Sequence, residues 1–130
     1  MHMARGRFGA AQARYSTIDV TSRIEGASPH KLVSILFDEL LKALDAMAAA
    51  QRRGDVGQRG SRQSRALAIL GGLETSLDFE KGGEIAKGLA AIYREARRLV
   101  IVAADVNDVA PVVQAREMLQ EIASAWDEIG

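Results

Sequence analysis

The chain has 130 residues, 17 basic and 17 acidic side chains, and no cysteine. This length is enough for one domain with its own core, and the absence of cysteine excludes disulfides and cysteine-ligated metal sites. Hydrophobic residues make up 48% of the chain, but no apolar run approaches the roughly 18 residues of a membrane-spanning helix. The composition therefore predicts a globular fold that is stabilised by packing.

The N-terminal segment is rich in glycine, arginine and alanine, which predicts a flexible stretch over residues 1–14. It lacks the apolar core of a signal peptide, and the second methionine, Met3, indicates that the first two residues are a cloning remnant. Apolar residues then occur at Tyr15, Ile18, Val20 and Ile24, with spacings that fit a short helix or an extended arm. We expect a single helical domain over residues 15–130.

The first long helix is predicted after Ser28 and Pro29. A serine can cap a helix and a proline suits the first helical position, while Gly54 is a plausible stop. The apolar residues between these signals alternate in steps of three and four, which keeps one face of a helix buried. They are Val33, Leu36, Leu40, Ala43, Met47 and Ala50.

A segment with five arginines, residues 52–65, comes next, and its glycines favour a solvated loop that runs into the second helix. Nucleic-acid binding is the alternative, but the segment has no aromatic side chain to stack on bases and no known reading motif. The second helix continues the apolar pattern, although Gly71 and Gly72 interrupt it at a cost of about 1 kcal/mol each relative to alanine. Its apolar positions are Ala66, Ile69 or Leu70, Leu73 and Leu77.

Two further helices complete the pattern, the third beginning near Gly83 and the fourth with Pro111 in its opening turn. The third has its apolar face at Ile85, Leu89, Ile92, Ala96, Leu99 and Ala103, and the fourth at Val112, Ala115, Leu119, Ile122, Trp126 and Ile129. The connections at 78–82 and 105–108 are short, so consecutive helices should be antiparallel. The sequence predicts an all-α fold, an antiparallel up-down-up-down four-helix bundle with an additional short N-terminal helix or arm.

Two helices carry more apolar residues than one buried face requires. The additional positions are Phe37, Leu41, Leu44 and Ala48 in the first helix, and Ala86, Ala90, Tyr93, Val100 and Ala104 in the third. Two interpretations are open at this point. The bundle can bury these flanking positions itself, or they can form a groove that receives another chain and that the N-terminal arm covers in its absence.

The sequence offers few candidate catalytic residues. The chain has no nucleophile elbow, no metalloprotease motif and no phosphate-binding loop. The acids near residue 80 do not match a calcium loop and suit the start of a helix instead. His30 has no catalytic partner nearby in sequence, and Trp126 is expected in the core. We expect no enzymatic activity, no cofactor and no metal site.

Three motifs carry a resemblance to a known family. They are Ser28-Pro29-His30-Lys31-Leu32 followed by Leu36-Phe37-Asp38, the segment Leu77-Asp78-Phe79-Glu80-Lys81-Gly82-Gly83-Glu84-Ile85-Ala86, and Ala125-Trp126. From about Tyr15 to Ile129 the chain resembles the flagellar secretion chaperone family FliS. The resemblance implies a small antiparallel bundle in the bacterial cytoplasm that binds the disordered C-terminal region of flagellin. Such a chaperone prevents premature polymerisation and assists delivery to the flagellar type III export apparatus.

The resemblance, combined with helical-wheel geometry, also predicts site residues. The flagellin-binding groove is expected at Leu32, Ile35, Phe37, Leu41, Leu44, Ile69, Leu73, Tyr93 and Val100. Tyr15, with Ile18 and Val20 beside it, matches the family's N-terminal arm, which docks at the export gate. The chain departs from the family pattern at three places. Glu39 stands where a glycine is common, and Gln12 where some members have an apolar residue. Arg94 and Glu95 replace the acidic residue and the aromatic residue that usually follow the tyrosine matched by Tyr93, so one aromatic contact is missing.

Other functions are compatible with the same pattern. A helical adaptor or regulator would use the bundle to bind a different amphipathic helix, and an RNA-binding protein would use the arginines. The spare apolar stripes would also let two copies pair as a homodimer in the absence of client.

Overall fold

The structure, a computed structural model, describes residues 24–129, and four helices make up most of this range. They are α2 (Pro29–Arg52), α3 (Val56–Thr75), α4 (Phe79–Asp105) and α5 (Ala110–Glu128). Residues 24–129 contain no strand, which confirms the all-helical prediction. The arm residues Tyr15, Ile18 and Val20 and the divergent Gln12 lie outside the described residues.

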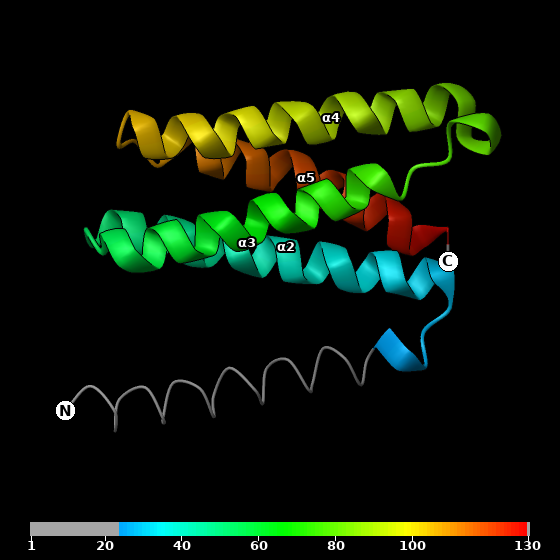
Figure 1. The fold of residues 1–130 in the computed structure, drawn as a ribbon, viewed down its shortest axis with the longest axis horizontal. Coiled ribbons are helices and arrows are strands. Elements are labelled where there is room, and N and C mark those ends of the chain that lie inside the picture. Colours follow the sequence, from blue (N-terminus) through cyan, green and yellow to red (C-terminus); the bar gives the residue numbers. More distant parts are fainter. Residues whose placement is uncertain (1–23, 130) are drawn as a thin grey trace.

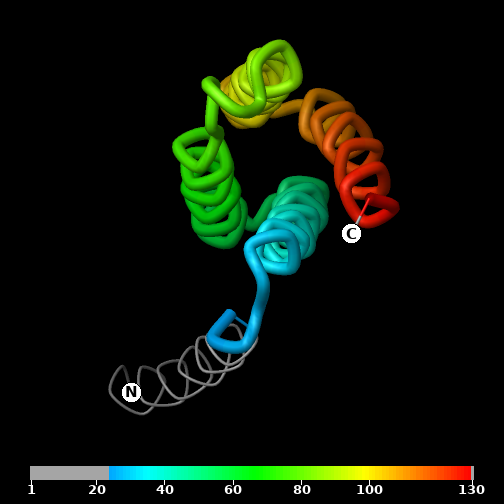
Figure 2. Tube along the Cα trace, turned by 90° about the vertical axis from the view of Figure 1, so that its right-hand side faces the viewer, coloured from blue at the N-terminus to red at the C-terminus, as the bar shows by residue number. Residues whose placement is uncertain are grey.

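The helices are antiparallel to their neighbours in sequence, and each lies alongside two others (Figure 1). Helix α2 packs against α3 and α5, and α4 packs against the same two helices. The end-on view shows the resulting ring, in which the order of the helices in space follows their order in the chain (Figure 2). This arrangement is an up-down-up-down bundle.

The predicted start of α2 and the opening turn of α5 are confirmed. The Ser28 hydroxyl accepts a hydrogen bond from the backbone N–H of Lys31 at 3.1 Å, and Pro29 occupies the first turn. After α2 ends, Gly54 takes a φ of +73°, a conformation that favours glycine. Pro111 lies in the first turn of α5, where its missing N–H removes no helical hydrogen bond.

The predicted arginine-rich loop is wrong for most of its length, because α3 already begins at Val56. The Asp55 carboxylate caps this start by accepting the N–H of Gln58 at 3.0 Å. Arg59, Arg62 and Arg65 are therefore helical despite the nearby glycines. The cap and the buried residues further along α3 outweigh the weak helix propensity of Gly57 and Gly60. A prediction from local composition gives these two glycines too much weight.

The core draws on all four helices, and most of the predicted apolar seams contribute to it. Its fully buried larger side chains include Leu40, Met47, Leu70, Leu119, Val100 and Val112. Two residues that were predicted on buried apolar faces are largely exposed, Ile85 at 77% and Ile129 at 73%, so these two predictions are wrong. Of the additional apolar residues on α2 and α4, only Leu41 and Ala104 are not buried. The bundle therefore buries most of the flanking positions itself.

Helix α4 is interrupted at Gly83, where φ is +48° and ψ is −125°. A side chain is strained in this conformation, so Gly83→Ala is expected to lower the free energy of unfolding by about 1–3 kcal/mol. Gly88→Ala is the matched control, because Gly88 lies in the same helix with no atom within 4 Å of an added Cβ. It should raise stability by about 0.5–1 kcal/mol. Urea unfolding followed by circular dichroism measures the unfolding free energies of both variants. Equal changes in the two variants would show that the backbone at Gly83 does not require glycine.

Candidate functional site

An apolar cavity of about 350 Å³ opens at the end of the bundle where α2 and α4 begin and α3 and α5 end. We call it the end cavity. All four helices contribute to its wall. The lining residues are Val33, Phe37, Leu73, Ser76, Leu77, Asp78, Lys81, Gly82, Ile85, Ala86, Leu89, Tyr93, Ile122 and Trp126.

The first turn of α4 forms part of the cavity rim. The Asp78 carboxylate caps it by accepting the N–H groups of Glu80 and Lys81 at 3.1 and 3.0 Å. Gly82 is required by close packing, because a Cβ there would lie 2.9 Å from the Cβ of Ala86. Together with the break at Gly83, this turn leaves Ile85 on the cavity wall and largely exposed.

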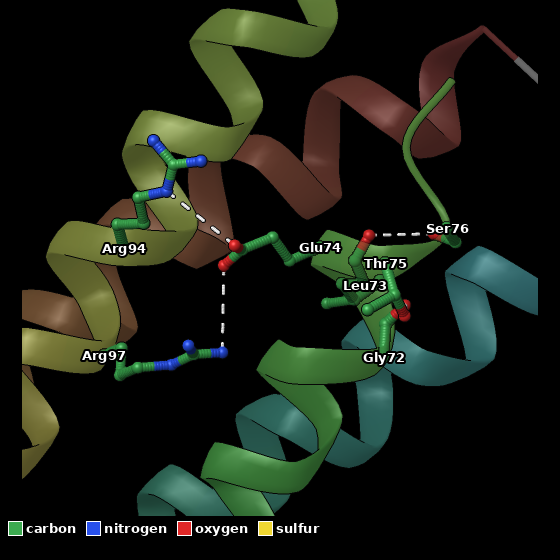
Figure 3. Close-up of polar contacts among 7 residues, drawn as sticks. All are labelled: Gly72, Leu73, Glu74, Thr75, Ser76, Arg94 and Arg97. Atoms are coloured by element: carbon green, nitrogen blue, oxygen red, sulfur yellow. Dashed lines mark hydrogen bonds and ion pairs between the residues drawn. The ribbon is translucent and has the colours of Figure 1, made fainter. Parts of the chain in front are cut away.

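Polar contacts hold the end of α3 against α4 at the level of the cavity (Figure 3). The Glu74 carboxylate lies between the guanidinium groups of Arg94 and Arg97, with both ion pairs at 3.7 Å. At the C-terminal end of α3, the Ser76 hydroxyl donates to the carbonyl of Leu73 at 2.8 Å. Ion pairs of this exposure are worth at most about 1 kcal/mol, so they orient the two helices more than they stabilise them.

The opposite wall joins α2 to α5 through Trp126 and His30. The two rings are stacked with centroids 4.5 Å apart, and the Trp126 indole Nε1 donates to the His30 carbonyl at 2.9 Å. Nearby, the Ser34 hydroxyl donates to the Asp127 carboxylate at 2.9 Å. Trp126, predicted in the core, is thus half-buried on the cavity wall, and His30 is a packing partner of it.

Tyr93 is the least exposed titratable side chain on the cavity wall. Only 3% of it is exposed, and its ring packs at a tilt against Phe37 with centroids 6.5 Å apart. Within residues 24–129 its hydroxyl makes no hydrogen bond, and it is not among the fully buried polar atoms that lack a partner, so solvent in the cavity reaches it. Burial raises the pKa of this phenol, because the charged form is poorly solvated there.

The raised pKa of Tyr93 predicts a loss of stability at alkaline pH. The neutral phenol is favoured in the folded state, so its contribution is complete below the unfolded pKa of about 10 and falls as pH rises through the folded value. Relative to Tyr93→Phe, the free energy of unfolding should decrease by up to about 1.4 kcal/mol per pH unit in that window. Urea unfolding of both proteins between pH 8 and 11 gives the unfolding free energy as a function of pH. If the unmodified chain and Tyr93→Phe show the same pH dependence, the prediction is contradicted.

The predicted groove residues are divided between the core, the cavity and the half-buried surface. Six of them are buried, namely Ile35, Phe37, Leu44, Leu73, Tyr93 and Val100. Leu32, Leu41 and Ile69 are half-buried. The end cavity brings together only Phe37, Leu73 and Tyr93 from this set. The role of the nine residues in client binding stays a prediction.

Several cavity residues were missed by the sequence analysis. Val33, Leu77, Leu89 and Ile122 had been assigned to core seams, and Ile85 with them. The Gly82-Gly83 pair is a sequence signal that could have indicated this site. Two adjacent glycines favour a break in a helix, and the break at Gly83 separates the first turn of α4 from the rest of the helix. Residues 24–129 include no group of three or more side chains suited to hold a metal ion and no helix long and apolar enough to cross a membrane.

The fold and the end cavity define a small four-helix bundle with an apolar opening at one end. The family model described as Flagellar protein FliS matches residues 11–130 of the chain. The chain belongs to the FliS family, whose curated members are flagellar secretion chaperones and not enzymes.

Its relatives are similar over most of their length. The flagellar secretion chaperone FliS of Salmonella typhimurium is 37% identical over 116 residues, which cover 88% of this chain and 86% of the relative. FliS of Vibrio cholerae is 36% identical over 93% of this chain and 88% of its own length. FliSB of Pseudomonas aeruginosa is 29% identical over 92% of this chain and 94% of its own length.

Proposed function

We propose that this chain is an export chaperone of the bacterial cytoplasm that binds the C-terminal region of flagellin. It prevents premature polymerisation of that client and assists its delivery to the flagellar type III export apparatus. Family membership supports this proposal, together with an open apolar cavity beside the exposed Ile85. No cofactor takes part.

The physics of such binding is coupled folding. A disordered client loses conformational entropy as it becomes ordered, so apolar burial must offset that cost. The end cavity, together with the half-buried Leu32, Leu41 and Ile69, offers that apolar surface. Tyr15, Ile18 and Val20 would form the arm that docks at the export gate.

Calorimetric titration with the C-terminal segment of flagellin from the same source tests the proposal. We expect tight one-to-one binding with a large negative heat-capacity change. Ile85→Asp, which places a charge on the cavity wall at an exposed position, should weaken binding at least tenfold. Ile129→Asp is the control, because Ile129 is equally exposed but outside the cavity lining, and its effect should be less than threefold.

Two outcomes would redirect the proposal. A folded chain that does not bind the segment would favour the adaptor function, in which another amphipathic helix is the client. Binding to nucleic acid that falls steeply with salt, and is lost when Arg59 and Arg62 are neutralised, would favour the RNA-binding function.

A further inference from the structure

We propose that the end cavity receives two large apolar side chains, one helical turn apart, from a single amphipathic helix of the client, and that the Tyr93 hydroxyl bonds a polar group of that helix. This inference rests on the proposed function and adds to it the side-chain pattern that the chaperone recognises. Size, shape and polarity of the cavity each support it.

The size of the cavity exceeds that of one side chain. Its volume of about 350 Å³ is more than twice the roughly 150 Å³ of an apolar protein cavity that binds one benzene molecule. A single leucine or phenylalanine would therefore leave part of the cavity empty, and an empty apolar volume loses packing contacts. Two side chains of that size match the space better.

The shape of the cavity follows the helices that build it. Beyond the break at Gly83, the lining along α4 extends from Ile85 to Tyr93, a rise of about 12 Å at 1.5 Å per residue. Helices α2 and α5 each contribute apolar residues four positions apart, namely Val33 and Phe37, and Ile122 and Trp126. Leu73 of α3 and Leu77 in the connection to α4 have the same separation in the sequence. Apolar side chains at i and i+4 of a helix lying along α4 have the same spacing, so they can enter side by side.

The polarity of the lining favours side chains of a polypeptide over a polar small molecule. The polar atoms of Ser76, Asp78 and Trp126 already bond within the chain. Lys81 lies exposed at the rim, and the Tyr93 hydroxyl, on a residue that is only 3% exposed, has no such partner within residues 24–129. One hydrogen bond from the bound helix would give this hydroxyl a protein partner when the client displaces solvent from the cavity.

The test fills the cavity and measures client binding. Val33→Phe adds volume to the wall, whereas Val113→Phe makes the same change in the first turns of α5, outside the cavity lining. Calorimetry with the flagellin C-terminal segment should show at least tenfold weaker binding for Val33→Phe and less than twofold for Val113→Phe. Tyr93→Phe should weaken binding about fivefold, the value of one neutral hydrogen bond. Circular dichroism verifies folding, and Leu77→Phe replaces Val33→Phe if that variant is unfolded.

Trp126 gives a local readout, because it is the only tryptophan of the chain and lies on the cavity wall. A client segment without tryptophan should shift the fluorescence emission of Trp126 when it binds the unmodified chain. The same segment should leave the emission of Trp126 unchanged in the Val33→Phe variant. Alanine replacements along the segment, combined with Val33→Phe in double-mutant cycles, should couple at one pair of apolar positions three or four residues apart.

The outcomes separate the two proposals. If the unmodified chain does not bind the segment, the proposed function fails. If it binds but Val33→Phe binds equally well, or coupling falls on one isolated position, the segment binds elsewhere or by a single side chain and this inference is overturned.

Discussion

Tyr93→Asp is expected to leave most of the chain unfolded at neutral pH. Tyr93 is 3% exposed and contacts Phe37, so the change removes a buried aromatic ring, typically worth about 3–5 kcal/mol. It also places a carboxylate where charge is poorly solvated, and an unpaired buried charge costs a further several kcal/mol. The sum is comparable to the whole stability of a domain, about 5–15 kcal/mol. Far-ultraviolet circular dichroism with urea unfolding measures the loss.

Tyr93→Phe is the matched control, because it keeps the ring and removes only a hydroxyl that has no partner within residues 24–129. We expect its stability to lie within about 1 kcal/mol of the unmodified chain. A folded Tyr93→Asp protein of normal stability would show that the position is not part of the packed interior. For this reason Ile85, and not Tyr93, is the appropriate site for a charge that tests client binding.

Trp126→Ala is expected to lower the free energy of unfolding by about 3 kcal/mol. The indole joins α5 to α2 by stacking on His30 and by donating to its carbonyl, and alanine removes both contacts. Trp126→Phe, which keeps an aromatic ring but no donor, should cost only about 1 kcal/mol. Thermal or urea unfolding measures both variants.

The comparison of the two Trp126 variants separates packing from hydrogen bonding at this wall. Equal losses would assign the effect to the hydrogen bond alone. Losses below about 0.5 kcal/mol in both would show that the end of the bundle is held mainly by the core beneath it.

The fold was largely predictable from local signals. Ser28 and Pro29 mark the start of α2, and the three-and-four spacing of apolar residues marks the buried faces. The start of α3 was less predictable, because the Asp55 cap competes with glycines at 57 and 60 whose cost depends on tertiary packing. Periodicity could not separate Ile85 and Ile129, which are exposed, from their buried neighbours.

The site was less predictable than the fold. Helical spacing shows which residues share a face but not where the side chains of four helices leave a cavity between them. Phe37, Leu73 and Tyr93 were predicted for a groove, and they line one open cavity. Ile35, Leu44 and Val100 were predicted with them, but they are buried outside its lining. The cavity depends on Gly82 and Gly83, whose close packing and backbone conformation are three-dimensional properties.

The ring of helices described above also bears on how quickly the chain becomes functional. Of its four main helix contacts, three join consecutive helices, and the contact between α2 and α5 joins the first and last of the four. Connections between consecutive helices close short loops at little entropic cost, and helical bundles of this kind fold in microseconds to milliseconds. A newly synthesised molecule would reach its folded state well within the seconds that translation of a client takes.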